Sequence, residues 1–504
     1  MGSDALYKVW YHDDAACSSV VRSGGAYESE LTGYGGNDVV LDFLVKSGLW
    51  GVMVSMEPDG LRKENGKPWR ALNGVEVLRE LAHVERIAHC GKIVRDVRLM
   101  MIAGFNAAIV AAAHGRGRGV VDPETLSNHL GRISPRSAWK TFLEHVGCLR
   151  RKRWIRGKTY VGDAHEVIVP YGRQYERLGR VGEKYGYKLV LLLNAEPGRE
   201  RVVGYILAPL QRSERTLLRI LLRGLEERFG RVGDWMATLI LDRGYWGAEY
   251  LLGLNRRHGV DVVTRAGHEG LSFVEDLKGL ARTPEMVWQW ERETHSRFGE
   301  IQVRCVGFDA LEVTNDQRRV IGRLNGVLAE EYDLAGNRLR DEKGQERPTF
   351  SYATTRPAAE RPHRVRAYYG MRWVIENQGF RELTQRWALD HLASRRFNAL
   401  NSRMGFAFML YNAERVLRMT YPGPWAEHRQ RLQLLGQRDL LGGPSIAVYT
   451  QEGHLGAYTP EAYGQLIAER ERNRIVSTLR EGLARGQSLE RLLDQVQLNP
   501  PPKA

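Results

Sequence analysis

The 504-residue sequence has few cysteines, and the four that it has are far apart. No two of them form a Cys-x-x-Cys pair, which argues against a disulfide framework and against a zinc ribbon. Such sparse, unpaired thiols are typical of a protein from a reducing cytoplasm. The four are Cys17, Cys90, Cys148 and Cys305.

Long hydrophobic runs are also missing. The most apolar stretch, Leu99 to Ala113, contains Gly104 and Asn106 and is shorter than the roughly 18 residues that a membrane span needs. We interpret it as a buried helix. The first residues, MGSDALYKVWYHDD, lack the apolar core of a signal peptide. The sequence therefore predicts a cytoplasmic protein without a membrane partner.

Several catalytic motifs are absent. The segment HEVIV, which begins at His165, is not the His-Glu-x-x-His pattern of a zinc site. A Walker phosphate loop and a serine nucleophile elbow are also missing. These absences argue against a zinc metalloprotease, an ATP-driven machine and a serine hydrolase.

Positive charge is in excess. The formal net charge is +14, from 74 Lys and Arg against 60 Asp and Glu. Because both signs are abundant, we expect the excess to lie in patches rather than in a disordered basic tail. This balance favours a polyanionic partner, either nucleic acid or a membrane surface, over a small acidic metabolite.

The densest basic segment is LRRKRWIRGK, at residues 149–158. Six cations and a tryptophan within ten residues suit contact with a phosphate backbone, although such runs are often only solvated surface. The residues that we select as candidate DNA contacts are Arg150, Arg151, Lys152 and Arg153.

The order of predicted elements indicates an α/β fold. Helical periodicity runs through 69–113 and 122–145, with Asp122 as an N-cap before Pro123. Five apolar runs then predict strands, with helices expected at 213–229 and 248–258. Residues 270–350 alternate polar and apolar positions and predict an inserted β module, after which helices return. The five runs lie within 159–171, 187–194, 201–210, 237–242 and 260–266.

Three carboxylates stand out by position. Asp163 lies within the first predicted strand, and Asp242 directly follows the apolar run ATLIL. Carboxylates at the carboxyl ends of buried strands point to the crevice where open α/β sheets bind ligands. Tyr369, Arg372 and Glu376 have the spacing i, i+3 and i+7, which puts them on one face of a predicted helix. Since a buried charge is costly, Glu376 is either paired with Arg372 or faces a site.

Three converging carboxylates repel one another unless a cation neutralises them. Mg²⁺ and Mn²⁺ take oxygen ligands of this kind. Two such ions, roughly 3.5–4 Å apart, clamp the attacking and leaving oxygens of a phosphoryl transfer. The fork of Arg372 matches phosphate geometry, and Tyr369 can donate to another phosphate oxygen. The residues thus point to a metal-dependent phosphoryl transferase that acts on DNA.

These residues, in this order, resemble those of the DDE transposases of bacterial insertion sequences, in the group with a Tyr-Arg-Glu-Lys signature. The resemblance rests on the strand with Asp163, on LDRGYWG with Asp242, and on the Tyr-x2-Arg-x3-Glu block that ends at Glu376. It spans roughly 158–419. It implies an RNase H-like mixed-sheet core, interrupted between Asp242 and Glu376 by the β module.

By this resemblance, Asp163, Asp242 and Glu376 are the catalytic residues and hold two Mg²⁺ or Mn²⁺ ions. Tyr369 and Arg372 would contact DNA near the transposon end. The implied reaction is hydrolysis that frees a 3′-OH, followed by attack of that hydroxyl on target DNA.

The sequence departs from the signature at its lysine. Seven residues after Glu376 stands Leu383, and if the extra Gly379 shifts the register, the position holds Thr384. Arg381 and Arg386 are the candidate substitutes, although each suits a solvated surface equally well. In related enzymes a tryptophan of the insertion stacks on a flipped base. Here the candidates are Trp288 and Trp290, with a role in the core as the alternative.

We therefore predict double-stranded DNA as the partner, as terminal inverted repeats and as target, bound by a homodimer that associates with the nucleoid. Two alternatives stay open: an RNase H-fold nuclease that never joins strands, and a domesticated DNA-binding protein without catalysis. The predicted domains are a largely helical DNA-binding region at 1–157, the core at 158–268 and 351–420, the β module at 269–350, and a helical region at 421–504 that helps two subunits to pair.

Overall fold

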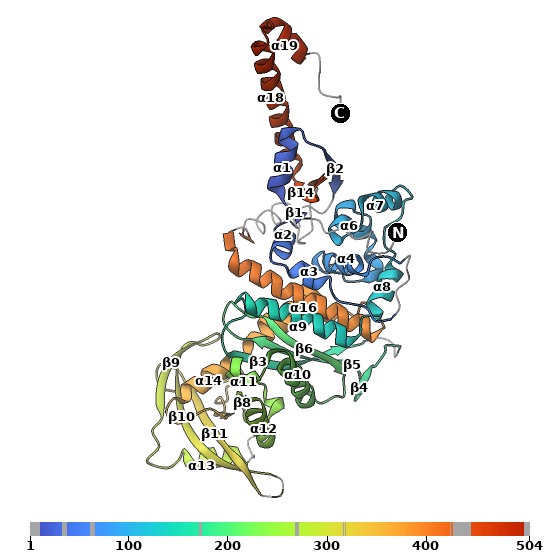
Figure 1. The fold of residues 1–504 in the computed structure, drawn as a ribbon. Coiled ribbons are helices and arrows are strands. Elements are labelled where there is room, and N and C mark those ends of the chain that lie inside the picture. The colour runs from blue at the N-terminus through green and yellow to red at the C-terminus, as the bar shows by residue number, and fades with distance from the viewer. Residues whose placement is uncertain are drawn as a thin grey trace. The chain divides into compact units, whose positions relative to one another are not determined.

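The structure is a computed structural model (Figure 1). It describes residues 11–32, 38–60, 66–170, 174–267, 272–315, 317, 319–423, 425–426 and 445–497. The chain divides into two compact units, Met1–Thr141 with Gly405–Ala504, and Phe142–Met404. None of the helices in these described ranges is both long and apolar enough to cross a bilayer.

The first unit is mainly helical in its N-terminal part. The Asp122 side chain accepts a hydrogen bond from the Glu124 N–H at 2.8 Å, which confirms the predicted cap. The long helices that the periodicity predicted are wrong in their extent, because short turns divide them. The helices are α1 (Asp14–Ser23), α2 (Asp38–Lys46), α3 (Leu49–Met53), α4 (Trp69–Leu81), η2 (Ile87–His89), α5 (Gly91–Val94), α6 (Val97–Ala103), α7 (Ala107–His114), α8 (Pro123–Gly131) and α9 (Pro135–Arg151), of which α9 continues into the second unit.

The apolar stretch from Leu99 to Ala113 shows how such a division arises. Gly104 has a φ of +110°, in the left-handed region, and ends α6. The Asn106 side chain then accepts from the Ala108 N–H at 2.9 Å and caps α7. The predicted single buried helix is therefore two helices.

A four-stranded sheet joins the two ends of this unit, in the order β1-β14-β13-β2. β1 runs parallel to β14, and β13 runs antiparallel to both β14 and β2. Buried side chains of α1, β13, β14 and α18 pack together in a small core beside it. We did not predict this sheet. Its strands are β1 (Tyr11–His12), β2 (Tyr27–Thr32), β13 (Ser445–Thr450) and β14 (His454–Tyr458), followed by α18 (Pro460–Ala484) and α19 (Leu489–Gln497).

The second unit is built on a ten-stranded sheet in the order β4-β5-β3-β7-β8-β12-β11-β10-β9, with β6 also paired to β5. All five strands that the apolar runs predicted are present, because those runs are buried in the sheet. The core strands are β3 (Thr159–Ile168), β4 (Gly179–Val181), β5 (Lys184–Asn194), β6 (Val202–Pro209), β7 (Thr238–Leu241) and β8 (Asp261–Arg265).

The core arrangement is RNase H-like. β6, β5 and β3 are antiparallel neighbours, and β3, β7 and β8 are parallel neighbours. The connections between the parallel strands contain helices, as parallel pairs require. These helices are α10 (Glu214–Phe229) and α11 (Val232–Trp235) before β7, and η3 (Arg243–Tyr245) and α12 (Ala248–His258) before β8.

The inserted segment extends the same sheet. Its last strand, β12, pairs antiparallel with β8, and β11, β10 and β9 follow outward, each antiparallel to its neighbour. The insertion is therefore hydrogen-bonded to β8, the last strand of the core in the chain before the insertion. A helix within it was not predicted. The elements are α13 (Ser272–Leu280), β9 (Gln289–His295), β10 (Gly299–Thr314), β11 (Val320–Tyr332) and β12 (Phe350–Thr354).

The segment from 368 to 387 is helical but is not the single α-helix that its spacing predicted. α14 (Pro362–Gly370) ends in a turn, and η4 (Ile375–Arg381) has π-helical hydrogen bonding before α15 (Glu382–Trp387). Gly379, the extra residue of the sequence block, lies in η4. A π turn absorbs one additional residue without breaking the helix, and such turns are frequent at functional sites. The long α16 (Phe397–Thr420) follows and continues into the first unit.

Candidate active site

Asp163 and Asp242 lie on two neighbouring inner strands of the core sheet, or directly after them. β3 and β7 are parallel, and Gly162 on β3 pairs with Leu241 on β7. Asp163 is the next residue of β3, and Asp242 directly follows the last residue of β7, so the strand register brings the two aspartates side by side. The Thr264 hydroxyl on β8 donates to the Asp242 carbonyl oxygen at 3.1 Å and helps to fix the start of the loop after β7.

Glu376, in the first turn of η4, is the third carboxylate. Arg372, in the turn between α14 and η4, donates from Nη1 to Glu376 Oε1. The same Nη1 lies 3.8 Å from Asp163 Oδ2, and Arg372 Nε lies 3.6 Å from Asp242 Oδ1. One guanidinium therefore contacts carboxylates from three distant segments. The sequence allowed two alternatives for Glu376, pairing with Arg372 or facing a site. In the structure Glu376 does both, because Arg372 itself lies among the three carboxylates.

Burial and the neighbouring charges both change the pKa of Asp163 in this cluster. Burial raises the pKa of Asp163 to about 7, since its side chain is only 16% exposed. The Ala164 N–H donates to Asp163 Oδ1 at 2.8 Å and acts in the opposite direction. The charges of Asp242 and Glu376 raise this pKa further, and Arg372 lowers it. Near neutral pH, Asp163 is therefore poised between its two protonation states.

Tyr369, at the end of α14, also faces the carboxylates. Its hydroxyl donates to Asp242 Oδ1 at 3.4 Å, and its ring lies 5.3 Å from the ring of Tyr352 on β12. Burial raises the pKa of Tyr369 to about 12, so the hydroxyl is a donor at neutral pH. Tyr369 and Arg372 thus contact the acidic cluster, and their predicted contacts with DNA stay predictions.

The three carboxylates supply the oxygen ligands that hard divalent ions prefer, and they lie half-buried around Arg372. In the described ranges, no three His, Cys, Asp or Glu side chains are arranged so that they could hold a metal ion as they stand. At this site the positive group among the carboxylates is Arg372. The residue types therefore fit Mg²⁺ or Mn²⁺, provided that the guanidinium moves aside.

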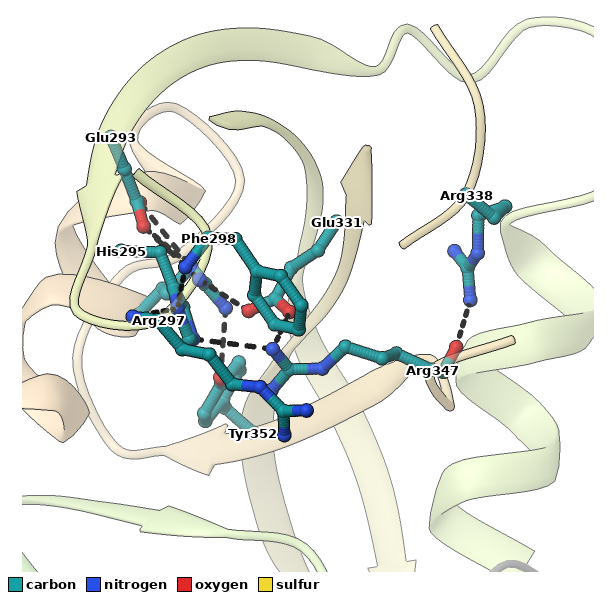
Figure 2. A network of polar contacts seen from close by, with 9 residues as sticks. Glu293, His295, Arg297, Phe298, Glu331, Arg338, Arg347 and Tyr352 are labelled. Atoms are coloured by element: carbon teal, nitrogen blue, oxygen red, sulfur yellow. Dashed lines mark hydrogen bonds and ion pairs between the residues drawn. The ribbon is translucent and has the colours of Figure 1, made fainter. Parts of the chain in front are cut away.

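A buried ion network fixes α14 against the insertion. Arg366, one turn before Tyr369, donates to Glu293 on β9 at 3.0 Å and to Glu331 on β11 at 2.7 Å. Arg347 lies 3.0 Å from the other oxygen of Glu331. Figure 2 shows Glu293, Glu331 and Arg347 turned toward one another in this network. The inserted strands therefore help to position the helix that carries Tyr369.

Sequence patterns gave no sign of two other groups near Asp242. Glu214, at the start of α10, has a raised pKa because of its burial, and the charge of Asp242 adds to the shift. Tyr245 is fully buried in η3, and its hydroxyl has no hydrogen-bond partner in the described ranges. The Asp-Arg-Gly-Tyr block that ends at Tyr245 was recognisable in the sequence, but residue spacing did not indicate that this tyrosine side chain is buried.

The residues of the basic segment, which begins in the last turn of α9, have different surroundings. The Arg150 guanidinium lies 4.7 Å from the ring of Phe229 and 4.6 Å from that of Trp235. This half-buried packing favours a structural role for Arg150 over the predicted phosphate contact. The following three basic residues are exposed, and their contact with DNA stays a prediction; they are Arg151, Lys152 and Arg153.

The position of the signature lysine has no basic side chain. Leu383 is fully buried, and the Thr384 hydroxyl donates to Asp390 at 3.4 Å. Of the candidate substitutes, Arg386 donates to Glu382, whereas Arg381 is exposed.

The two tryptophans of the insertion lie beside one arginine. The Arg304 guanidinium is 4.6 Å from the ring of Trp288 and 5.9 Å from that of Trp290. The Trp290 ring, half exposed, also lies 5.1 Å from that of Tyr332.

Fold and site together define an RNase H-like protein with three carboxylates around one arginine: Asp163 within β3, Asp242 directly after β7, and Glu376 in η4. The model of one family, the transposase DDE domain, matches residues 158–413, which is just over half of the chain. The chain belongs to this family. A search of curated proteins found no match. The predicted DDE transposase class is therefore confirmed, while the subgroup with the Tyr-Arg-Glu-Lys signature stays a prediction.

Proposed function

We propose that this protein is an insertion-sequence transposase that cleaves DNA at transposon ends and joins the freed 3′-OH to target DNA, with Asp163, Asp242 and Glu376 as its catalytic residues. The observation that carries the proposal is the meeting of these three carboxylates around Arg372, inside the region that matches the DDE family.

The same three residues would hold two Mg²⁺ or Mn²⁺ ions. Such ions, when bound, supply the Lewis acidity that activates the attacking oxygen and stabilises the leaving oxygen. The raised pKa of Asp163 supports this assignment, because a buried carboxylate among other carboxylates gains most from a nearby cation. Arg372 provides part of that charge in the structure.

Arg372 and Tyr369 would then turn to the DNA. The guanidinium fork matches two oxygens of one phosphate, and the tyrosine hydroxyl donates to another. Arg151, Lys152 and Arg153 would contact the backbone outside the site, since all three are exposed. The substrate is double-stranded DNA, as terminal inverted repeats and as target, and we expect a homodimer in the DNA complex, acting on the nucleoid in the cytoplasm.

The test is an end-joining assay. The protein is incubated with Mg²⁺, supercoiled plasmid and duplexes that carry the inverted repeats flanking its gene and end in a 3′-OH. We expect plasmid joined to these duplexes, and cleavage when the ends are embedded in longer DNA. Cleavage without any joined product would support a nuclease instead, and binding without either reaction would support a non-catalytic DNA-binding protein.

The matched variant is Asp242→Asn, which keeps the shape of the side chain and removes its charge. We expect cleavage to fall by at least about a thousandfold, equivalent to ~4 kcal/mol of transition-state stabilisation. DNA affinity should be largely kept, because Asp242 contributes no positive charge. Cleavage at the wild-type rate would overturn the assignment of the site.

A further inference from the structure

A second feature of the core unit is a cavity of about 750 Å³ whose walls come from α10, α12 and the adjoining ends of β10 and β11. Four arginines line it, two from each helix. Arg215 and Arg219 are one turn apart on α10, and Arg256 and Arg257 are neighbours near the end of α12.

The cavity has a strong excess of positive charge. Within the described ranges, none of its four arginines forms an ion pair with a carboxylate, and Glu249 is the sole acidic residue among the described lining residues. Guanidinium groups gathered in this way repel one another, and an anion relieves that repulsion. Each guanidinium presents a planar fork of donors that matches phosphate oxygens.

Neighbouring groups contact three of the four arginines. The ring of Tyr250 lies 5.0 Å from the Arg219 guanidinium and 5.8 Å from that of Arg215. Arg256 Nη2 donates to the Ile321 carbonyl oxygen at 2.8 Å, which ties α12 to the insertion. Three of the four positive charges are therefore positioned before any ligand arrives, which lowers the side-chain entropy that binding costs.

The cavity shares a loop with the acidic site. Arg215 Nη2 donates to the carbonyl oxygen of Gly244 at 3.2 Å and to that of Trp246. Both residues belong to the loop that starts at Asp242, and the next residue, Gly247, lines the cavity. One loop therefore connects a proposed catalytic carboxylate with the arginine-lined wall.

We propose that this arginine-lined cavity binds the phosphodiester backbone of DNA beside the acidic site, independently of base sequence. The inference rests on the proposed function, which supplies DNA as the substrate. Donors from two helices, spread along an open cavity, suit successive phosphates of a strand better than one small anion. Arginines that contact phosphates fix the register of DNA without reading its bases.

The test is the double variant Arg219→Gln, Arg257→Gln. Both side chains are exposed, and neither forms the carbonyl contacts by which Arg215 and Arg256 support the loop and the insertion. Affinity for a mixed-sequence duplex is measured as a function of salt concentration. Since each phosphate contact contributes about 0.9 to the slope of log K against log salt, the slope should fall by about 1.8. Affinity should fall by at least about tenfold at ~0.1 M salt.

The control is Arg472→Gln, Arg480→Gln, which removes the same charge from exposed positions on α18. An unchanged slope in the first variant, or an equal change in the control, would overturn the inference. The single variant Arg257→Glu gives a second measurement at one exposed position, and it should weaken binding more than Arg257→Gln.

The outcome is separable from that of the end-joining assay. If the wild-type protein cleaves and joins DNA but the double variant binds duplex with the wild-type slope, the cavity proposal alone fails. If the double variant loses the slope but the wild-type protein neither cleaves nor joins its element ends, the proposed function fails and the DNA-binding cavity stands.

Discussion

Arg372 and Glu376 form an ion pair across one turn, and the same guanidinium lies 3.8 Å from Asp163 and 3.6 Å from Asp242. A single side chain thus balances part of the charge of three acids. Cations that bind these acids must displace it, and the displaced guanidinium is then able to take a phosphate. Ion binding and DNA binding at this site would therefore be linked.

The first prediction concerns Arg372→Ala. Without divalent ions, this variant leaves three half-buried carboxylates close together, so we expect the free energy of unfolding to fall by about 1–3 kcal/mol. Saturating Mg²⁺ should restore most of the loss, because an ion then takes the place of the guanidinium. Thermal unfolding of both proteins, in chelator and in Mg²⁺, measures this.

A matched control is Arg381→Ala, which removes an exposed arginine of the same segment. Its stability should change by less than about 0.5 kcal/mol in either buffer. If Arg372→Ala has the wild-type Tm in chelator, or gains no more from Mg²⁺ than the wild-type protein does, Arg372 does not serve as the counter-charge of the cluster.

The second prediction concerns the buried pair of Arg366 and Glu331, whose side chains are 12% and 3% exposed. Arg366→Met leaves Glu331 with Arg347 as its remaining ion partner, and loss of one member of a buried pair costs about 3 kcal/mol. Because Arg366 also positions α14, single-turnover cleavage should slow at saturating DNA. Urea unfolding and single-turnover kinetics give the two values.

Arg297→Met provides the comparison, because Arg297 pairs with Glu342 at the surface, where both side chains are more than half exposed. Surface pairs contribute at most about 1 kcal/mol. Equal losses of stability in the two variants would mean that the buried network does not hold the insertion against α14.

The third prediction concerns the basic residues at the end of α9, where we expect Arg150 and Lys152 to have different roles. Arg150→Gln removes cation–π contacts with Phe229 and Trp235, and it should destabilise the protein by about 1–2 kcal/mol without changing the salt slope of DNA binding. Lys152 is exposed and its ammonium lies 5.3 Å from the Trp154 ring, so Lys152→Gln should lower stability by less than about 1 kcal/mol. It should lower the salt slope by about 0.9 for duplexes of any sequence. The prediction would be wrong if Arg150→Gln lowered the salt slope while Lys152→Gln lowered stability by more than about 1 kcal/mol. It would also be wrong if Lys152→Gln weakened binding to one DNA sequence alone.

The fourth prediction concerns pH. His145 is fully buried, neither ring nitrogen has a hydrogen-bond partner in the described ranges, and burial lowers its pKa to about 3. The unfolded chain, with a histidine pKa near 6.5, therefore binds more protons as the pH falls below that value. The stability that the neutral ring contributes is present above pH ~6.5 and is lost as the pH falls toward about 3.

His145→Leu removes this dependence. The free energy of unfolding of the variant relative to the wild-type protein should rise by about 2 kcal/mol between pH ~8 and pH ~5. His129→Leu is the informative comparison, because His129 Nε2 lies 2.7 Å from Asn73 Oδ1 and its loss leaves a buried amide oxygen without that partner. A difference between His145→Leu and wild type that is constant with pH would mean that His145 is not buried in its neutral form.

The central strands were predictable because each is an apolar run that the sheet buries. The small sheet of the first unit was not, since β2 reads YESELT, with polar residues at most positions, and its partner β13 lies some 400 residues further on. Alternation correctly predicted an insertion rich in strands. It could not reveal α13, whose nine residues are too few to show helical periodicity clearly.

For the site, spacing predicted that Tyr369, Arg372 and Glu376 share a face, and their contacts agree with this. Spacing could not predict the turn after α14 or the π-helical segment, because both depend on backbone hydrogen bonds that the pattern of side chains does not encode. Spacing also could not distinguish Arg150 from its basic neighbours. Arg150 is half-buried because it packs on the ring of Trp235, which is far away in the sequence.

The parallel pairing of β1 with β14 has a consequence for synthesis. Tyr11 of β1 pairs with His454 of β14. Because β1 is synthesised first and β14 near the end of translation, β1 cannot pair until almost the whole chain has been made. All of Phe142–Met404 leaves the ribosome in between and can fold meanwhile. A nascent chain arrested after Met404 would carry a folded second unit but an unfinished first unit, which would couple the maturation of the first unit to release of the whole polypeptide.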